Sequence, residues 1–196
     1  MTYKDLCQIA DKRIKTTQNI LPINSFAIAG SLGLRIKNSI EAKQDFKNTI
    51  NPLSYCNACL TLNNSEYTIY YDEKYSYKNF AIAHEISHYL LNHSCDDHSC
   101  DGIEQHHDAN LLASIIIAPK RLILINGIKS AVQLSTTCMI PFEVANEYWS
   151  ELEFNVDISD DTSSVNDYLR EIKSMFMDIG KLLNNIENVH IGGVAI

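Results

Sequence analysis

Apolar residues recur at helical spacing through much of this chain, and they predict a largely helical domain. An apolar residue every three or four positions occurs over five segments: 3–15, 76–92, 103–118, a short stretch near 131, and 141–152. Ser76 is the expected N-cap of the second helix, which should end near Asn92. Pro119 should stop the third helix, because proline cannot continue the backbone hydrogen-bond pattern.

Two segments have strand character instead. Residues 58–62 and 66–71 are rich in apolar and aromatic side chains, and 63–65 between them is a turn signal. In the second strand two sets of residues alternate as on a strand buried on one face: Tyr67, Ile69 and Tyr71 against Thr68 and Tyr70. Residues 25–40 fit neither spacing clearly. The pattern therefore predicts an α+β fold with a small antiparallel sheet.

The chain divides into three parts. Residues 1–152 contain the predicted helices and strands and form the main domain. Residues 153–164 form an acidic linker rich in small residues. From 165 to 196 apolar residues repeat at intervals of three and four, which predicts one long amphipathic C-terminal helix and a tail. This helix could pack on its own domain, pair with a second copy in a homodimer, or bind another partner.

Composition and charge exclude several classes of protein. Hydrophobic residues make up 45% of the chain and aromatic residues 9%, which is sufficient for a packed core. A net charge of -8 argues against binding to nucleic acid or an anionic membrane. Residues 134–152 have a helix-turn-helix rhythm but contain no Lys or Arg. Residues 1–15 lack the apolar core of a signal peptide, and the apolar run 111–118 is too short to cross a bilayer. We therefore expect a cytoplasmic protein.

The most informative motif is His84-Glu85-x-x-His88, within the second predicted helix. Two histidines four residues apart lie on one face of a helix and can bind the same Zn²⁺. Glu85 is then placed to act as the general base toward an attacking water. The alternative is an amphipathic helix whose histidines only pack or form hydrogen bonds. The motif favours a zinc-dependent peptide hydrolase.

Six cysteines offer further chemistry. Cys56 and Cys59 have C-x-x-C spacing, which fits a metal knuckle or a redox pair, but we expect them to be small buried side chains that lead into a strand. A second cluster follows the motif helix: His93, Cys95, His98 and Cys100. This cluster could hold a second metal, although a polar loop of coincidental composition is the preferred interpretation.

Two motifs together resemble the ImmA/IrrE family of metallopeptidases. The first runs from Phe80 through the H-E-x-x-H motif to Leu90-Leu91-x-His93, and the second is Asp108-Ala109-Asn110-x-Leu112-Ala113-Ser114-x-Ile116-Ile117-Ala118-Pro119. The resemblance covers about 54–152. It implies a compact zincin-like peptidase fold, a bound Zn²⁺, and a helix-turn-helix transcriptional repressor as the protein substrate. In such peptidases an edge strand holds the substrate backbone, and the 58–71 hairpin is the candidate for it.

The chain departs from the family pattern at the third metal ligand. Where the family has a glutamate, three residues before the Ala-Asn pair, this chain has His106. His106 could complete a three-histidine site, Glu104 could bind after a local shift, or the site could bind metal weakly or not at all. We favour His106, with Asn110 one turn later to orient a ligand.

A second function remains open at this stage. The altered third ligand and the long C-terminal helix fit an inactive regulator that uses the peptidase fold to sequester a repressor or antitoxin. Glu85 argues for the enzyme, since a binding protein has no chemical need for a glutamate at that position.

Overall fold

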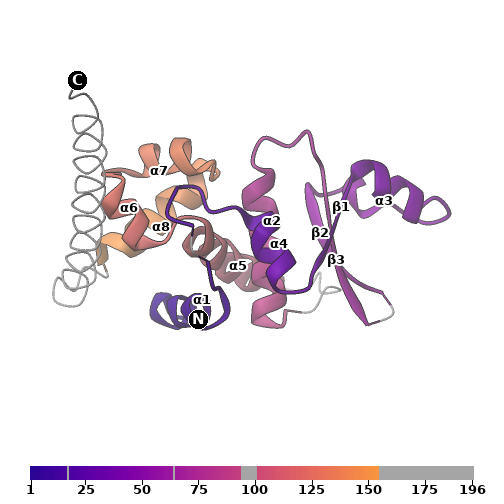
Figure 1. The fold of residues 1–196 in the computed structure, drawn as a ribbon, viewed down its shortest axis with the longest axis horizontal. Coiled ribbons are helices and arrows are strands. Elements are labelled where there is room, and N and C mark those ends of the chain that lie inside the picture. Colours follow the sequence, from indigo (N-terminus) through magenta and orange to yellow (C-terminus); the bar gives the residue numbers. More distant parts are fainter. Residues whose placement is uncertain (17, 64, 94–100, 155–196) are drawn as a thin grey trace, which may run out of the picture. The chain divides into compact units, whose positions relative to one another are not determined.

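The computed structural model describes residues 1–16, 18–63, 65–93 and 101–154, which belong to one compact unit (Figure 1). The predicted C-terminal helix, most of the acidic linker and residues 94–100 lie outside the described residues. The mixed α+β class is confirmed. The final helix of the unit, α8, spans Phe142–Phe154 and so extends two residues beyond the predicted end of the domain.

A three-stranded sheet forms one side of the unit. Its strands are β1 (Arg35–Asn38), β2 (Ala58–Asn63) and β3 (Glu66–Tyr71), in the order β1-β3-β2. β2 and β3 are antiparallel, as the predicted hairpin requires, but β1 runs parallel to β3, so the sheet is mixed and not antiparallel as predicted. β1 lies within residues 25–40, for which the sequence pattern predicted neither a helix nor a strand. β2 therefore lies at an edge of the sheet formed by the described residues.

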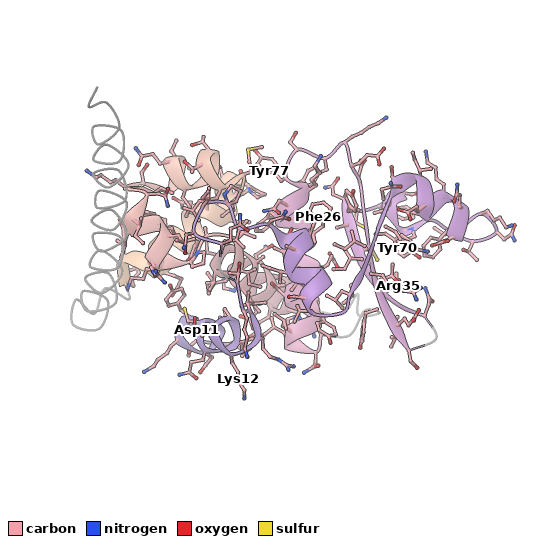
Figure 2. All side chains as sticks on the ribbon, viewed as in Figure 1. Asp11, Lys12, Phe26, Arg35, Tyr70 and Tyr77 are labelled. Atoms are coloured by element: carbon pink, nitrogen blue, oxygen red, sulfur yellow. The ribbon has the colours of Figure 1, made fainter. Side chains whose placement is uncertain are left out.

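Both faces of the sheet are covered, which corrects the prediction of a strand buried on one face. Thr68, Ile69 and Tyr70 are all buried. Helix α3 (Ser39–Asp45) covers one face, where the Tyr70 hydroxyl donates to Asp45 (Figure 2). Helices α2 (Ser25–Ser31) and α4 (Lys78–Leu91) cover the other face (Figure 1).

Aromatic contacts fix α2 and α4 on their face of the sheet. The ring of Phe26 on α2 packs edge-on against Tyr71, with centroids 5.2 Å apart. Tyr89 on α4 makes the same kind of contact with Tyr67 at 5.0 Å. Such edge-to-face pairs add to the free energy gained from burying the rings. These contacts hold α4 directly behind the strand pair.

The motif helix, α4, ends at Asn92 as predicted but begins differently. Its N-cap is Tyr77, which makes no side-chain capping bond, so the prediction that Ser76 caps the helix is wrong. Asn92 ends the helix in the left-handed conformation, with φ 54°, where an asparagine is tolerated better than most side chains. Buried Ile82 and Ile86 anchor the inner face. That anchoring leaves the face with the motif histidines directed toward α5.

Helix α5 (Asp101–Ile117) runs beside α4 and is the central helix of the unit. Its second half, from Leu111 onward, is buried without interruption to Ala118. It ends two residues before Pro119, as predicted. The buried Tyr148 hydroxyl donates to the Ala118 carbonyl at 2.9 Å and so satisfies an acceptor that the helix leaves unpaired. This packing fixes α5 along its length.

The remaining elements surround α5. They are α1 (Tyr3–Arg13), the short 3₁₀ helix η1 (Pro52–Ser54), α6 (Lys120–Ile125) and α7 (Ala131–Cys138). α1 and α7 were predicted, although α1 ends two residues early. Thr2 and Asp5 form a capping box at the start of α1. Within the described part of the chain, no helix is both long and apolar enough to cross a membrane.

Candidate metal centre

Three histidines meet between α4 and α5. His84 and His88 stand one turn apart on α4, and His106 comes from the first half of α5. The metal-ligating atoms of these three side chains all lie within 4.8 Å of one another. Glu104 does not belong to this group. The two motif histidines and the favoured third ligand are therefore brought together, close enough to hold one metal ion.

The ring nitrogens converge closely. His84 Nε2 lies 3.0 Å from His88 Nε2 and 3.1 Å from His106 Nδ1. In a tetrahedral zinc site with Zn–N bonds of 2.0–2.1 Å, ligand nitrogens are about 3.3 Å apart. The observed spacing thus needs to widen by only a few tenths of an ångström. Three imidazoles are also a donor set that zinc accepts readily.

His93 fixes the orientation of His88. The Nδ1 atoms of the two rings are 3.0 Å apart. If the His88 Nδ1–H donates to His93, the His88 Nε2 lone pair points at the converging nitrogens. Metal-ligating histidines commonly donate their second ring N–H in this way. His93 therefore contacts the candidate metal centre, and the run Leu90-Leu91-x-His93 in the sequence is the signal for this position.

The second ring nitrogen of His84, Nδ1, faces away from the other two histidines of the cluster and lies near Asn110. His84 Nδ1 is the single buried side-chain nitrogen or oxygen without a hydrogen-bond partner among the described residues. The Asn110 side chain interacts with the His84 ring and favours its protonated form, which raises the pKa. Asn110 is thus the residue positioned to orient His84, one turn after His106 on α5.

Burial keeps the motif histidines neutral. Desolvation, followed by the neighbouring His106, lowers the pKa of His84 to about 4. Desolvation and then His84 lower the pKa of His88 to about 3. Desolvation also lowers the pKa of His93, while the charge of Asp108 opposes this. Only a neutral imidazole can bind a metal, so these rings are in the ligand form at neutral pH.

Glu85 lies between the histidine cluster and the sheet. Its Oε2 accepts a hydrogen bond of 2.8 Å from the Leu60 backbone N–H on β2. Desolvation raises its pKa to about 7, although the Leu60 hydrogen bond opposes the shift. Because this N–H donates to Glu85, it makes no backbone hydrogen bond to β3. It therefore lies on the edge of β2 that faces away from β3. Sequence reasoning did not foresee this contact, since spacing along the chain cannot show which backbone group a side chain meets.

The structure differs from the prediction about Cys56 and Cys59. Cys56 is exposed and Cys59 is partly exposed, so the expectation of small buried side chains is wrong. The strand that follows buries Ala58 and Leu60 instead. His107 pairs with Glu147 on α8 and not with the histidine cluster. Cys95, His98 and Cys100 lie outside the described residues.

Comparisons of the chain with protein-family models, with curated proteins and with solved structures find no match. The functional argument therefore depends on the geometry of the site. That geometry comprises three converging imidazoles, a carboxyl group with a raised pKa on α4 beside two of them, and the edge strand of the described sheet next to this carboxyl group.

Proposed function

We propose that the chain is a zinc-dependent endopeptidase with a zincin-like fold, whose metal ligands are His84, His88 and His106. The convergence of these three side chains next to Glu85 is the observation that carries the proposal. Zinc suits three neutral imidazoles, and a catalytic zinc site has three protein ligands and one open position. The exposed side of His106 leaves room for that position.

Glu85 has the properties of a general base. When bound, zinc would polarise the scissile carbonyl and make water easier to deprotonate. The Leu60 N–H holds Glu85 Oε2, and Oε1 is left to take a proton from the attacking water. Glu85 then transfers this proton to the leaving amine. A pKa near 7 suits both steps, because such a group can hold and release a proton at neutral pH.

The open edge of β2 supports a peptide substrate. An extended peptide could add to this edge as a further strand, with backbone hydrogen bonds to β2. The Leu60 N–H at this edge contacts Glu85, so such a peptide would pass beside the general base. The narrower proposal, that the substrate is a cytoplasmic helix-turn-helix repressor, depends on the resemblance to the ImmA/IrrE family.

Metal content is the first test. The full chain, purified without added metal or a histidine tag, should contain one zinc, and His84→Ala and His106→Ala should each lose it. His107→Ala is the matched control, because His107 neighbours His106 on α5 but pairs with Glu147. Zinc retained by His106→Ala would move the third ligand elsewhere. If the wild-type protein binds no zinc even when zinc is supplied, the proposal of a zinc-dependent endopeptidase is refuted.

Hydrolysis is tested with Glu85→Gln. This variant should keep zinc, since Glu85 is not a ligand, and should lose about 100-fold to 10,000-fold in kcat on a cleavable peptide or repressor. If the wild type binds zinc and a repressor tightly but cleaves nothing, the protein is the sequestering regulator instead.

A further inference from the structure

Two thiols lie close together where the edge strand begins. Cys56 follows η1 and Cys59 is the second residue of β2. Neither is part of a disulfide, the two side chains interact with each other, and Cys59 Sγ also lies 3.6 Å from the Leu60 carbonyl oxygen. Cys56 is exposed, and its Sγ lies 3.3 Å from the Pro52 carbonyl oxygen. The C-x-x-C spacing thus produces a thiol pair that solvent can reach.

The surroundings of Cys56 favour its thiolate. The hydrogen bond from Cys59 and the backbone N–H of Ala58 outweigh partial burial and lower the pKa of Cys56 to about 7. The buried Cys138 shows the opposite behaviour, because desolvation raises its pKa to about 12. Thiolates, not thiols, react with oxidants, so exposure and charge both point to Cys56 as the reactive member of the pair.

We infer that Cys56 and Cys59 form a site of reversible oxidation, in which a hydroperoxide converts the pair into an intramolecular disulfide. The Cys56 thiolate attacks one peroxide oxygen, the O–O bond breaks, and the departing alkoxide takes a proton to become an alcohol. Cys59 then attacks the sulfenic sulfur of Cys56, an S–S bond forms, and the hydroxide that leaves takes the Cys59 proton to become water. Two thiols and one hydroperoxide give one disulfide, one alcohol and one water.

Closing the bond brings the two Sγ atoms to about 2.05 Å from each other. The ring that forms contains four residues and includes the start of β2. Leu60, which holds Glu85 through its N–H, follows Cys59 directly. Oxidation would therefore constrain the strand that borders the candidate metal centre, but the inference about the thiols does not depend on that centre.

Peptide mass mapping of the full chain tests the inference. Reduced protein is treated with graded hydrogen peroxide, and the remaining thiols are then alkylated. We expect one disulfide between Cys56 and Cys59, reversed by dithiothreitol. Cys59→Ser should stop at a sulfenic acid on Cys56 that a cyclic dione traps, and Cys56→Ser should leave Cys59 reduced at the same dose. Circular dichroism and melting of both variants check that the fold is unchanged.

Alkylation rates provide an independent measurement. At pH 7 Cys56 should react about 10-fold faster than an ordinary thiol, because about half of it is thiolate. Cys7, which is partly buried in α1, is the internal reference. The inference is overturned if Cys56 reacts no faster than Cys7, if both thiols of the pair remain alkylatable after oxidation, or if Cys56 instead cross-links to Cys95 or Cys100.

Discussion

Ring nitrogens at the histidine cluster are arranged for a cation. His84 Nε2 faces both His88 Nε2 and His106 Nδ1 at about hydrogen-bond distance. If His88 donates its other N–H to His93, the facing lone pairs repel one another unless a proton or a metal lies between them. Burial disfavours the proton by lowering the pKa values of His84 and His88. A metal ion removes this conflict without adding a buried proton.

His93→Ala tests the orientation of His88. The variant removes the acceptor at His88 Nδ1 but none of the three proposed ligands. Zinc affinity, measured by competition with a chelator of known affinity, should fall about 10-fold to 100-fold. His107→Ala should bind as the wild type does. Equal affinity of wild type and His93→Ala would show that His93 does not orient the site.

Glu85→Gln tests the carboxyl with the raised pKa through stability. The pKa of Glu85 is raised from an ordinary 4.5 to about 7, so the folded state favours its protonated form. Its stabilising contribution is fully present below pH 4.5 and is lost as pH rises through 7. In chelated protein, the free energy of unfolding of Glu85→Gln relative to wild type should rise by about 1–3 kcal/mol between pH 4.5 and pH 8.

The comparison with wild type is needed because the histidines have the opposite effect. The pKa values of His84 and His88 are lowered from 6.5, so their contribution is present above pH 6.5 and is lost as pH falls toward 4. Subtracting wild type from Glu85→Gln cancels this slope. Urea unfolding at pH 4.5, 6, 7 and 8 measures the difference, and a flat difference would contradict the raised pKa.

Spacing along the chain predicted part of the site and missed the rest for a clear reason. The H-E-x-x-H motif identifies His84 and His88 because both lie on one helix, where four residues make about one turn. Bringing His106 to them depends on the packing of α5 against α4, which residue spacing cannot show; the resemblance to a family supplied that residue. The contact of Glu85 with Leu60 joins a helix to a strand edge and had no signal in the sequence.

At the level of elements, β2 is the strand that links the sheet to the site. It lies at the edge of the described sheet and places one backbone N–H against Glu85. Backbone N–H groups alternate in direction along a strand, so those of Leu60 and Leu62 point to the open edge and that of Thr61 points to β3. Thr61 and Leu62 are therefore neighbouring positions whose N–H groups face opposite sides, which makes substitutions at them a matched pair.

Proline at two neighbouring positions tests which backbone N–H groups of β2 face β3 and which face away from it. Leu62→Pro removes an N–H that faces the open edge, and proline is tolerated on that side of an edge strand. Thr61→Pro removes an N–H from the ladder with β3 and leaves a carbonyl unpaired. We expect Thr61→Pro to lower the free energy of unfolding by about 1–3 kcal/mol more than Leu62→Pro, measured by urea unfolding. Equal losses would mean that the register is different.

The elements themselves were predicted where the pattern was local. The hairpin, α5 and its stop before Pro119 follow from periodicity and turn residues. The prediction that β3 is buried on one face only is wrong, because the alternation of its residues does not show whether another element covers the second face. α3 covers that side, and Tyr70 meets both Asp45 and the ring of Phe46 there. β1 was missed because a four-residue strand has too few positions to establish a period, and its pairing with β3 spans about thirty residues.

At the scale of the whole unit, the proposed metal would join the two central helices. α4 packs against the sheet through its aromatic contacts, and α1 and α8 pack against α5. The histidines lie where these two halves meet, and residues 94–100 between α4 and α5 lie outside the described structure. A zinc ion held by both helices would stabilise the folded state, because the unfolded chain does not hold the three ligands together.

Thermal unfolding measures this stabilisation. Free zinc at 1,000 times its dissociation constant should add about 4 kcal/mol to the free energy of unfolding, which for a unit of this size raises the melting temperature by about 8–16 °C. A chelator should reverse the shift. His84→Ala should melt at the same temperature with and without zinc, because it lacks the ligand whose Nε2 contacts both other rings. A zinc-dependent shift of equal size in His84→Ala would mean that the ion binds elsewhere, whereas a shift lost in His84→Ala and in His106→Ala but kept in His107→Ala would assign the stabilisation to the junction of α4 and α5.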